Sequence, residues 1–248
     1  MTDGKPAVAG RHRRGGFWLL TALALVALVI LVGLGNWQVR RLAWKEGLID
    51  RIAERMASAP LPLAGVETLF AGTGDVDYLP AMATGTFEHG GEQHFFATHQ
   101  GSSGYYVYTP LRLADGRVLF VNRGFVPFDR KDPATREAGQ TAGVVTVTGL
   151  ARNPLAEKPG GVYENDLAAN IYYWKDLEAM AASAGLDPDK VLPFFLDADD
   201  TANPGGLPVG GVTLVNLPNN HLQYAITWYG LAVALAGVWI AFAIRRRP

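Results

Sequence analysis

One histidine lies where an apolar segment of the chain begins. His221 precedes the uncharged run 225–244, and the two asparagines before it are of a residue type that caps helix N-termini. A histidine nitrogen is a common axial ligand of haem iron, and a flat apolar ring suits a helix face of aromatic and small side chains. The residues alone favour an interfacial histidine beside an aromatic belt, and haem ligation by His221 is the alternative. On a helix, the residues sharing its face would be Tyr224, Ala225, Trp228, Leu231, Ala232 and Leu235.

The other groups that could do chemistry form no recognisable catalytic arrangement. His89, His94 and His99 recur every five residues, which matches neither a helix face nor one face of a strand, so surface histidines are favoured over a metal site. The chain has no cysteine, which excludes thiolate catalysis, disulfides and cysteine-ligated metals. The nucleophile-elbow, P-loop and dinucleotide-binding motifs are missing, as is a basic stripe with interleaved aromatics. We expect neither an enzyme nor a nucleic-acid-binding protein.

Two uncharged segments must position His221. Residues 17–34 and 225–244 contain no charged side chain. At about 1.5 Å per residue, such lengths span roughly the 30 Å hydrocarbon core of a lipid bilayer. We therefore predict transmembrane helices over 17–35 and 223–244. A cleaved signal peptide is the competing interpretation of the first segment, but the sequence that follows it is a poor cleavage site.

The charges that flank these segments predict their orientation. Three arginines precede the first span, and three follow the second. Between residues 191 and 244 there is no Lys or Arg, so the positive-inside rule places the C-terminal end in the cytoplasm. With two spans, both tails (1–16 and 245–248) are expected in the cytoplasm and residues 36–222 in the periplasm. The predicted location is a bacterial inner membrane, with the protein crossing it twice.

The region between the spans is predicted to be rich in antiparallel β-structure, which makes the fold class α+β. The first helix should continue to about Ser58, because apolar residues recur at helical spacing until Pro60 and Pro62. Gly90-Gly91 and Ala114-Asp115-Gly116 are predicted hairpin turns, and a sheet or partly closed barrel is expected. The tail 1–16 is expected to lack regular structure. Predicted strands cover 81–89, 92–98, 105–113, 117–122, 144–151, 192–197 and 211–215, with a short helix over 175–184.

Four blocks of sequence resemble a known family. The first leaves the apolar N-terminal segment, and the last contains His221. In this order along about 35–231, they resemble the Surfeit-locus family of cytochrome c oxidase assembly factors. One departure is Glu164-Asn165-Asp166-Leu167, which lacks the proline usual in the family's turn. The blocks are Gly33–Arg41 with Trp44-Lys45, Gly104–Leu111 with Val121–Pro127, Trp174–Met180 and Asn220–Leu231.

The resemblance implies a bacterial protein that helps to mature haem-copper oxidase, at or near the insertion of haem a into the large subunit. The partners that it implies are that subunit and a haem a synthase. It also favours His221 as the ligand of haem a. We add the hypothesis that Tyr224 and Trp228 flank the ring and that Arg40 or Arg41 pairs with the propionates, because a guanidinium suits carboxylates. The alternative function is a cofactor-free scaffold that stabilises an oxidase assembly intermediate.

Arg123 is a further candidate for such a carboxylate, because it lies at the end of a predicted strand between Asn122 and Gly124. The sequence favours a structural ion pair or a carbonyl clamp for this arginine.

Overall fold

The structure, a computed structural model, describes residues 9–213 and 217–245. Its contacts divide the chain into two compact units. The first combines residues 1–51 with residues 216–248, and the second comprises residues 52–215. The orientation was predicted from six arginines that flank the two spans. Of these six, the structure describes only the side chain of Arg245.

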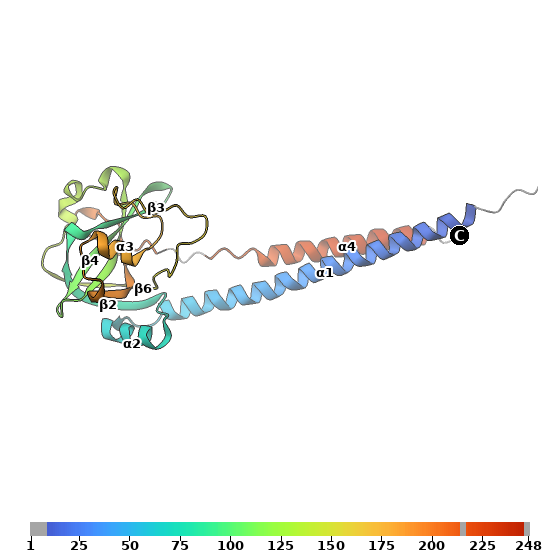
Figure 1. Cartoon of the computed structure of the whole chain (residues 1–248). Coiled ribbons are helices and arrows are strands. Elements are labelled where there is room, and N and C mark those ends of the chain that lie inside the picture. The colour runs from blue at the N-terminus through green and yellow to red at the C-terminus, as the bar shows by residue number, and fades with distance from the viewer. Residues whose placement is uncertain (1–8, 214–216, 246–248) are drawn as a thin grey trace, which may run out of the picture. The chain divides into compact units, whose positions relative to one another are not determined.

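The first unit is built from two long helices (Figure 1), α1 (Ala9–Met56) and α4 (His221–Arg245); the last residues of α1, from Ile52, belong to the second unit. Each contains an 18-residue window apolar enough to cross a membrane, with mean hydropathy of 2.8 in α1 and 1.8 in α4. The predicted continuation of the first span as helix is confirmed, since α1 ends before Pro60. The helix also starts at Ala9, so part of the segment 1–16 is helical rather than irregular.

The two helices pair through a narrow seam. The less exposed residues of each helix follow one another in alternating steps of four and three. That 3.5-residue period is the pattern of a left-handed coiled coil. The seam of α4 consists of His221, Ala225, Trp228, Ala232, Leu235, Trp239 and Phe242, and that of α1 of Phe17, Thr21, Ala24, Leu28, Leu31, Gly35, Gln38, Leu42 and Lys45.

Contacts at both ends of the seam show that the helices run antiparallel. Near the start of α1, Phe17 stacks on Phe242 of α4 with ring centroids 6.2 Å apart. Further along α1, the hydroxyl of Tyr229 donates a hydrogen bond to Oδ1 of Asn36 at 2.7 Å. A Cβ atom on Gly35 would lie only 2.7 Å from the Tyr229 ring, so the close approach requires glycine there.

The second unit is a β-rich domain with two apolar clusters, and its central strand contributes side chains to both. This strand, β5 (Val118–Pro127), is buried along nearly its whole length, and its successive side chains enter two different apolar clusters. Leu119 and Val121 face the larger cluster, while Phe120 faces the cluster that packs against α3 (Leu177–Ser183). The strands are β1 (Leu61–Pro62), β2 (Leu79–Phe87), β3 (Gln93–His99), β4 (Ser102–Leu113), β5 (Val118–Pro127), β6 (Val144–Arg152) and β7 (Val191–Ala198).

The strand order closes the sheet on itself. The sheet runs β1-β2-β6-β7-β5-β4-β3, and an additional pairing joins β2 to β4. Five strands thus form a ring, so of the two expected arrangements, a sheet or a partly closed barrel, the second is present. The predicted antiparallel β-structure is present in five strand pairs. Two pairs were not predicted to be parallel but are: β5 with β7, and β1 with β2. A long connection through α3 allows the parallel β5–β7 pair, since parallel strands need a crossover.

One predicted hairpin is confirmed and the other is wrong. β4 and β5 pair across the turn at Gly116, whose φ is 87°. Strands β2 and β3, by contrast, do not pair: β3 pairs with β4 across Gln100 and Gly101, which both have positive φ. Tight hairpin turns need positive φ, and Gly90-Gly91 instead forms part of a 3-10 turn at His89–Gly91.

Other short elements complete the domain. The predicted helix near residue 180 is present as α3, which Asp176 caps and after which Gly185 adopts a φ of 66°. Helix α2 (Leu63–Thr73) was not predicted. The strand predicted over 211–215 is absent at 211–213, and its remainder lies outside the described residues. Short 3-10 turns occupy Phe128–Arg130, Pro133–Gly139, Pro188–Lys190 and Pro204–Gly206.

Gly35→Val is expected to destabilise the helix pair by about 1–3 kcal/mol, because an added side chain overlaps the Tyr229 ring. Gly33→Val is the matched control, since no atom lies within 4 Å of the position that its Cβ would take. Both variants replace a glycine of α1 by valine, so the change in intrinsic helix propensity is the same in both. Thermal unfolding in detergent, followed by far-UV circular dichroism, measures the difference. Equal melting temperatures for the two variants would contradict the close approach at Gly35.

Candidate functional site

His221 is the first residue of α4. Its backbone N–H donates to Oδ1 of Asn219 at 3.4 Å, so one of the two predicted asparagines does satisfy the helix end. The imidazole is half-buried on the α1 side of α4. A histidine at a helix start that is neither enclosed nor fully exposed can present one ring nitrogen to a ligand while the other is held by the protein.

The imidazole is held by an amide on the other helix. Nδ1 of His221 lies 2.7 Å from Oε1 of Gln38, whose side chain is only 7% exposed. Among residues 9–213 and 217–245, no group bonds to Nε2 of His221. The two ring nitrogens are therefore in different environments, one engaged and one free to accept a ligand.

The predicted aromatic partners of His221 divide between two sides of α4. Trp228 is half-buried on the side of α4 that carries the buried Ala225 and Ala232. Tyr224 is 54% exposed and Leu231 48% exposed, so they do not share the face of Ala225 as expected. The reason is the narrow 3.5-residue seam, which leaves positions one residue away from it outside the contact.

Arg40 and Arg41 both lie on the exposed surface of α1, two and three residues beyond Gln38. The Arg41 guanidinium stacks over the Trp44 ring at 4.0 Å from its centroid. Neither arginine forms an ion pair within the described part of the chain. Both are therefore available to an anionic group near the end of the seam, Arg41 from a position that Trp44 partly fixes.

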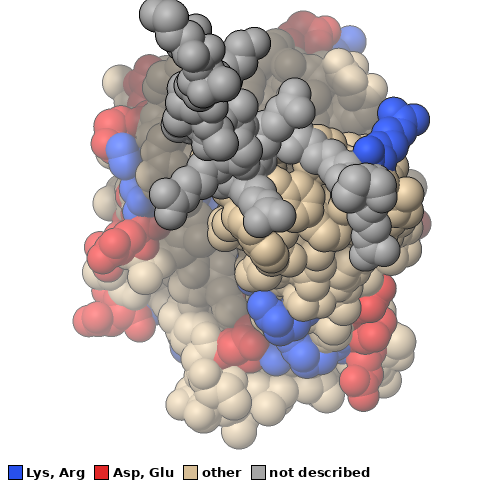
Figure 2. Space-filling view, turned by 90° about the vertical axis from the view of Figure 1, so that its right-hand side faces the viewer, with Lys and Arg blue, Asp and Glu red and all other residues tan. Residues whose placement is uncertain are grey.

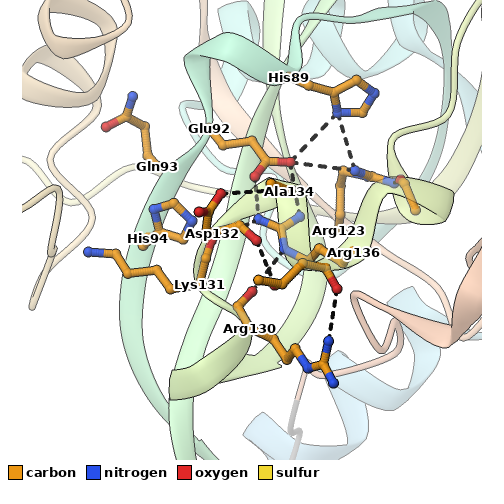
Figure 3. A network of polar contacts seen from close by, with 12 residues as sticks. His89, Glu92, Gln93, His94, Arg123, Arg130, Lys131, Asp132, Ala134 and Arg136 are labelled. Atoms are coloured by element: carbon orange, nitrogen blue, oxygen red, sulfur yellow. Dashed lines mark hydrogen bonds and ion pairs between the residues drawn. The ribbon is translucent and has the colours of Figure 1, made fainter.

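A second cluster of charged groups lies in the β-rich domain and was not predicted. Figure 3 shows Glu92 between two arginines that come from different elements, Arg123 of β5 and Arg136 of the 3-10 turn Pro133–Gly139. The Glu92 carboxylate accepts two hydrogen bonds from Arg136 and lies 3.7 Å from Arg123. All three side chains are at most 2% exposed. The arrangement is a buried ion-pair network rather than an open site.

Arg123 also clamps loops. One of its nitrogens donates to the carbonyl of Gly139 and to Oδ1 of Asn203, and its guanidinium lies over the Phe87 ring. These contacts agree with the structural ion pair and carbonyl clamp favoured from the sequence. They occupy the guanidinium inside the domain, which leaves little of it to meet a haem propionate.

The network determines the ionisation of its members. Burial by itself would raise the pKa of Glu92, but hydrogen bonding to His89 and Arg136 and the charges of Arg136 and Arg123 lower it to about 2. Burial lowers the pKa of Arg123 to about 10. Glu92 is therefore a carboxylate throughout the neutral range, and it offsets part of the cost of burying two guanidinium groups.

The three histidines spaced by five residues do not converge. His89 bonds to the carbonyl of Thr141 and faces Glu92, and His99 packs on Phe125 with ring centroids 5.3 Å apart. His94 is not on the surface as expected but buried, and burial lowers its pKa to about 4. Within the described residues, no group of three metal-ligating side chains comes together.

The whole chain can be compared with known proteins. The model of the SURF1 family matches residues 25–233. Surfeit locus protein 1 of Rattus norvegicus is 37% identical over 248 positions, covering 93% of this chain and 76% of the rat protein. This chain belongs to the SURF1 family. The human Surfeit locus protein 1 is 34% identical, with 93% and 78% coverage, and a SURF1-like protein of Monosiga brevicollis is 34% identical, with 94% and 90% coverage.

Membership of the SURF1 family agrees with the resemblance drawn from four sequence blocks. The most specific of those blocks contain both partners of the interhelical bond, Gln38 in the first and His221 in the last. The sequence signal that could have identified Gln38 is its spacing: it lies three residues after Gly35, on the same helix face. No comparable signal exists for Glu92 and Arg136, which are 44 positions apart.

Replacing Glu92 tests the buried network of this SURF1-family chain. Glu92→Gln should lower the free energy of unfolding by about 3–5 kcal/mol, because two buried guanidinium groups lose their carboxylate. Glu88→Gln is the matched control: Glu88 pairs with Arg112 at side-chain exposures of 36% and 39%, and its loss should cost less than about 1 kcal/mol. Chemical denaturation followed by near-UV circular dichroism measures both.

The same network predicts an acid dependence. The folded-state pKa of Glu92 is about 2 against an ordinary value of 4.5, so its stabilisation is complete above the ordinary value and is lost as the pH falls towards 2. The wild type should lose stability over that acidic range more steeply than Glu92→Gln. Parallel pH profiles of the two proteins would contradict the assigned network.

Proposed function

We propose that this SURF1-family chain assists the assembly of haem-copper cytochrome c oxidase by binding haem a and presenting it for insertion into the large oxidase subunit. The observation that carries the proposal is the position of His221. Its Nε2 atom has no partner in the described part of the chain, at the N-terminus of a helix apolar enough to cross a membrane. A neutral histidine nitrogen in that setting is suited to haem iron.

The side chains around His221 fit a haem. The iron needs an unprotonated imidazole nitrogen, the apolar macrocycle needs uncharged surface, and the propionates need cations. His221 supplies the imidazole nitrogen, and the exposed Tyr224 ring supplies uncharged surface. Arg40 and Arg41 supply unpaired guanidinium groups on α1. Trp228, being half-buried, is proposed to support the ring from the seam side.

A bound haem would supply a redox-active iron, and His221 would hold that iron through a neutral imidazole nitrogen. The part that we assign to the chain is to bind, orient and release this group, so we propose a transport or chaperone role rather than an enzymatic one. The proposed partners are the large oxidase subunit and a haem a synthase, because the group must be received and handed on.

We further propose that the chain is a bacterial member of the family that crosses the inner membrane twice. Both termini would then face the cytoplasm and the β-rich domain the periplasm. The two candidate membrane helices and the arginines that flank them support this orientation. On the face drawn in Figure 2, basic and acidic side chains are intermingled, a distribution that does not favour nucleic acid.

A cofactor-free scaffold is the second candidate, and an aromatic cluster on the β-rich domain favours it. Phe96 and Phe128 are 40% and 49% exposed, and Phe96 contacts Phe128 and Tyr173 at 6.0 and 5.8 Å between centroids. Exposed aromatic groups of this kind are typical of protein contact surfaces. A scaffold would retain partner binding without His221, whereas a haem carrier would lose its haem.

His221→Ala is expected to abolish the haem a Soret band of protein purified in detergent from cells that make haem a. The reason is the loss of the proposed iron ligand. His99→Ala is the control, because this imidazole packs on Phe125 in the other unit. Unchanged far-UV circular dichroism would show that both variants are folded. The proposal that His221 ligates haem would be contradicted if the wild type contained no haem, or if His221→Ala kept its full haem content.

The orientation can be tested with single cysteines, because the chain has none of its own. Asp115→Cys, in the exposed β4–β5 turn, should react with a membrane-impermeant maleimide in intact spheroplasts. A cysteine appended after Pro248 should react only after the membrane is opened. The reverse pattern would place the β-rich domain in the cytoplasm.

A further inference from the structure

The hydrogen bond across the seam defines a role for Gln38. We propose that Gln38 is a positioning residue that holds His221 in the Nδ1–H tautomer and so leaves the lone pair of Nε2 free to bind iron. The part of this inference that concerns iron rests on the proposed function. The part that concerns the tautomer is a property of the chain alone.

The direction of the bond decides the tautomer. Oε1 of Gln38 lies 2.7 Å from Nδ1 of His221, and a carbonyl oxygen can only accept a hydrogen bond. Nδ1 must therefore carry the proton. A neutral imidazole has a single N–H group, so Nε2 is then unprotonated. If the amide were turned round, its NH2 group would donate to Nδ1 and Nε2 would be protonated, which would prevent ligation.

Burial makes the bond a defined contact rather than a surface pair. Gln38 is 7% exposed although it lies on a helix with many lipid- or solvent-facing residues. In such surroundings a hydrogen bond is stronger than in water, and an unpaired amide is costly. Gln38 is thus expected to keep His221 as its partner whether or not a ligand is present.

The packing of the helices fixes the two partners, which are 183 positions apart in the chain. Gly35, one turn before Gln38, accommodates the Tyr229 ring, which lies two turns after His221. Tyr229 in turn bonds to Asn36. A shift of either helix along the other would separate Gln38 from His221 and would also break these neighbouring contacts.

A histidine that binds a metal usually donates its other N–H to a nearby acceptor, which fixes the ring and raises its basicity. Loss of such an acceptor typically weakens metal affinity about 10–100-fold. Gln38 occupies this place with respect to His221. It touches no iron itself, and its effect passes through the imidazole.

The tautomer can be measured without haem. Protein labelled with 15N-histidine is prepared haem-free in lipid nanodiscs, about two pH units above the ordinary histidine pKa of about 6.5. The His221 signals are assigned by their absence in His221→Ala. A protonated Nδ1 and a bare Nε2 are expected. A protonated Nε2 in the wild type would overturn the inference without any variant of Gln38.

Two variants separate this bond from the general stability of the helix pair. Gln38→Met has a similar shape but no acceptor, and it should shift His221 towards the Nε2–H tautomer and weaken haem affinity about 10–100-fold. Tyr229→Phe is the matched control, because it removes the interhelical bond to Asn36 and keeps the ring against Gly35. It should change neither the tautomer nor the affinity. An unchanged tautomer in Gln38→Met would overturn the assigned role.

The haem titration distinguishes the two proposals. Wild type that binds no haem overturns the proposed function and the iron part of this inference, while the tautomer measured in the haem-free protein still decides the role of Gln38. Wild type that binds haem through His221 but shows equal affinity in Gln38→Met overturns this inference alone.

Discussion

At Gly35 the two apolar helices approach so closely that the Tyr229 ring fills the space where a side chain would project. This contact sets the register of the antiparallel pair, because the ring cannot slide past a larger neighbour. The register then determines which polar groups meet: Asn36 with Tyr229, and Gln38 with His221. The environment of the proposed haem ligand is therefore a consequence of helix packing and not of the residues next to it in the chain.

Buried polar groups have different roles in the two units. In the β-rich domain, Glu92 neutralises part of the charge of Arg123 and Arg136 and ties the start of β3 to loops that follow β5. The polar contacts of Glu92 and Arg136 there are made with other groups of the protein. At the helix pair, by contrast, His221 retains one ring nitrogen without a partner among the described residues. Nitrogens without a partner also occur in the β-rich domain, at both ring atoms of the buried His94 and at Nε of Arg123. His221 differs from them because its ring is only half-buried, so a ligand can reach Nε2.

The barrel is a unit of its own, organised around β5. β5 is buried on both faces and joins antiparallel and parallel neighbours, so it holds the two apolar clusters together. The aromatic groups at Phe96, Phe128 and Tyr173 remain partly exposed next to β3. In the proposed function the helix pair handles the cofactor, and this aromatic surface is a suitable place for protein contact.

The sequence alone determined the two apolar helices, the start of α4 at His221 and most strands, because these features depend on periodicity and turn residues within a few positions. It predicted the β4–β5 hairpin correctly but not the other strand pairs: Gly90-Gly91 suggested a hairpin, but positive φ occurs instead at Gln100 and Gly101. The contacts of Gln38 and Glu92 were not predicted from the sequence, and the reason is the same for both. Their partners lie 183 and 44 positions away, and only the close packing of helices and loops brings such distant groups within hydrogen-bonding distance.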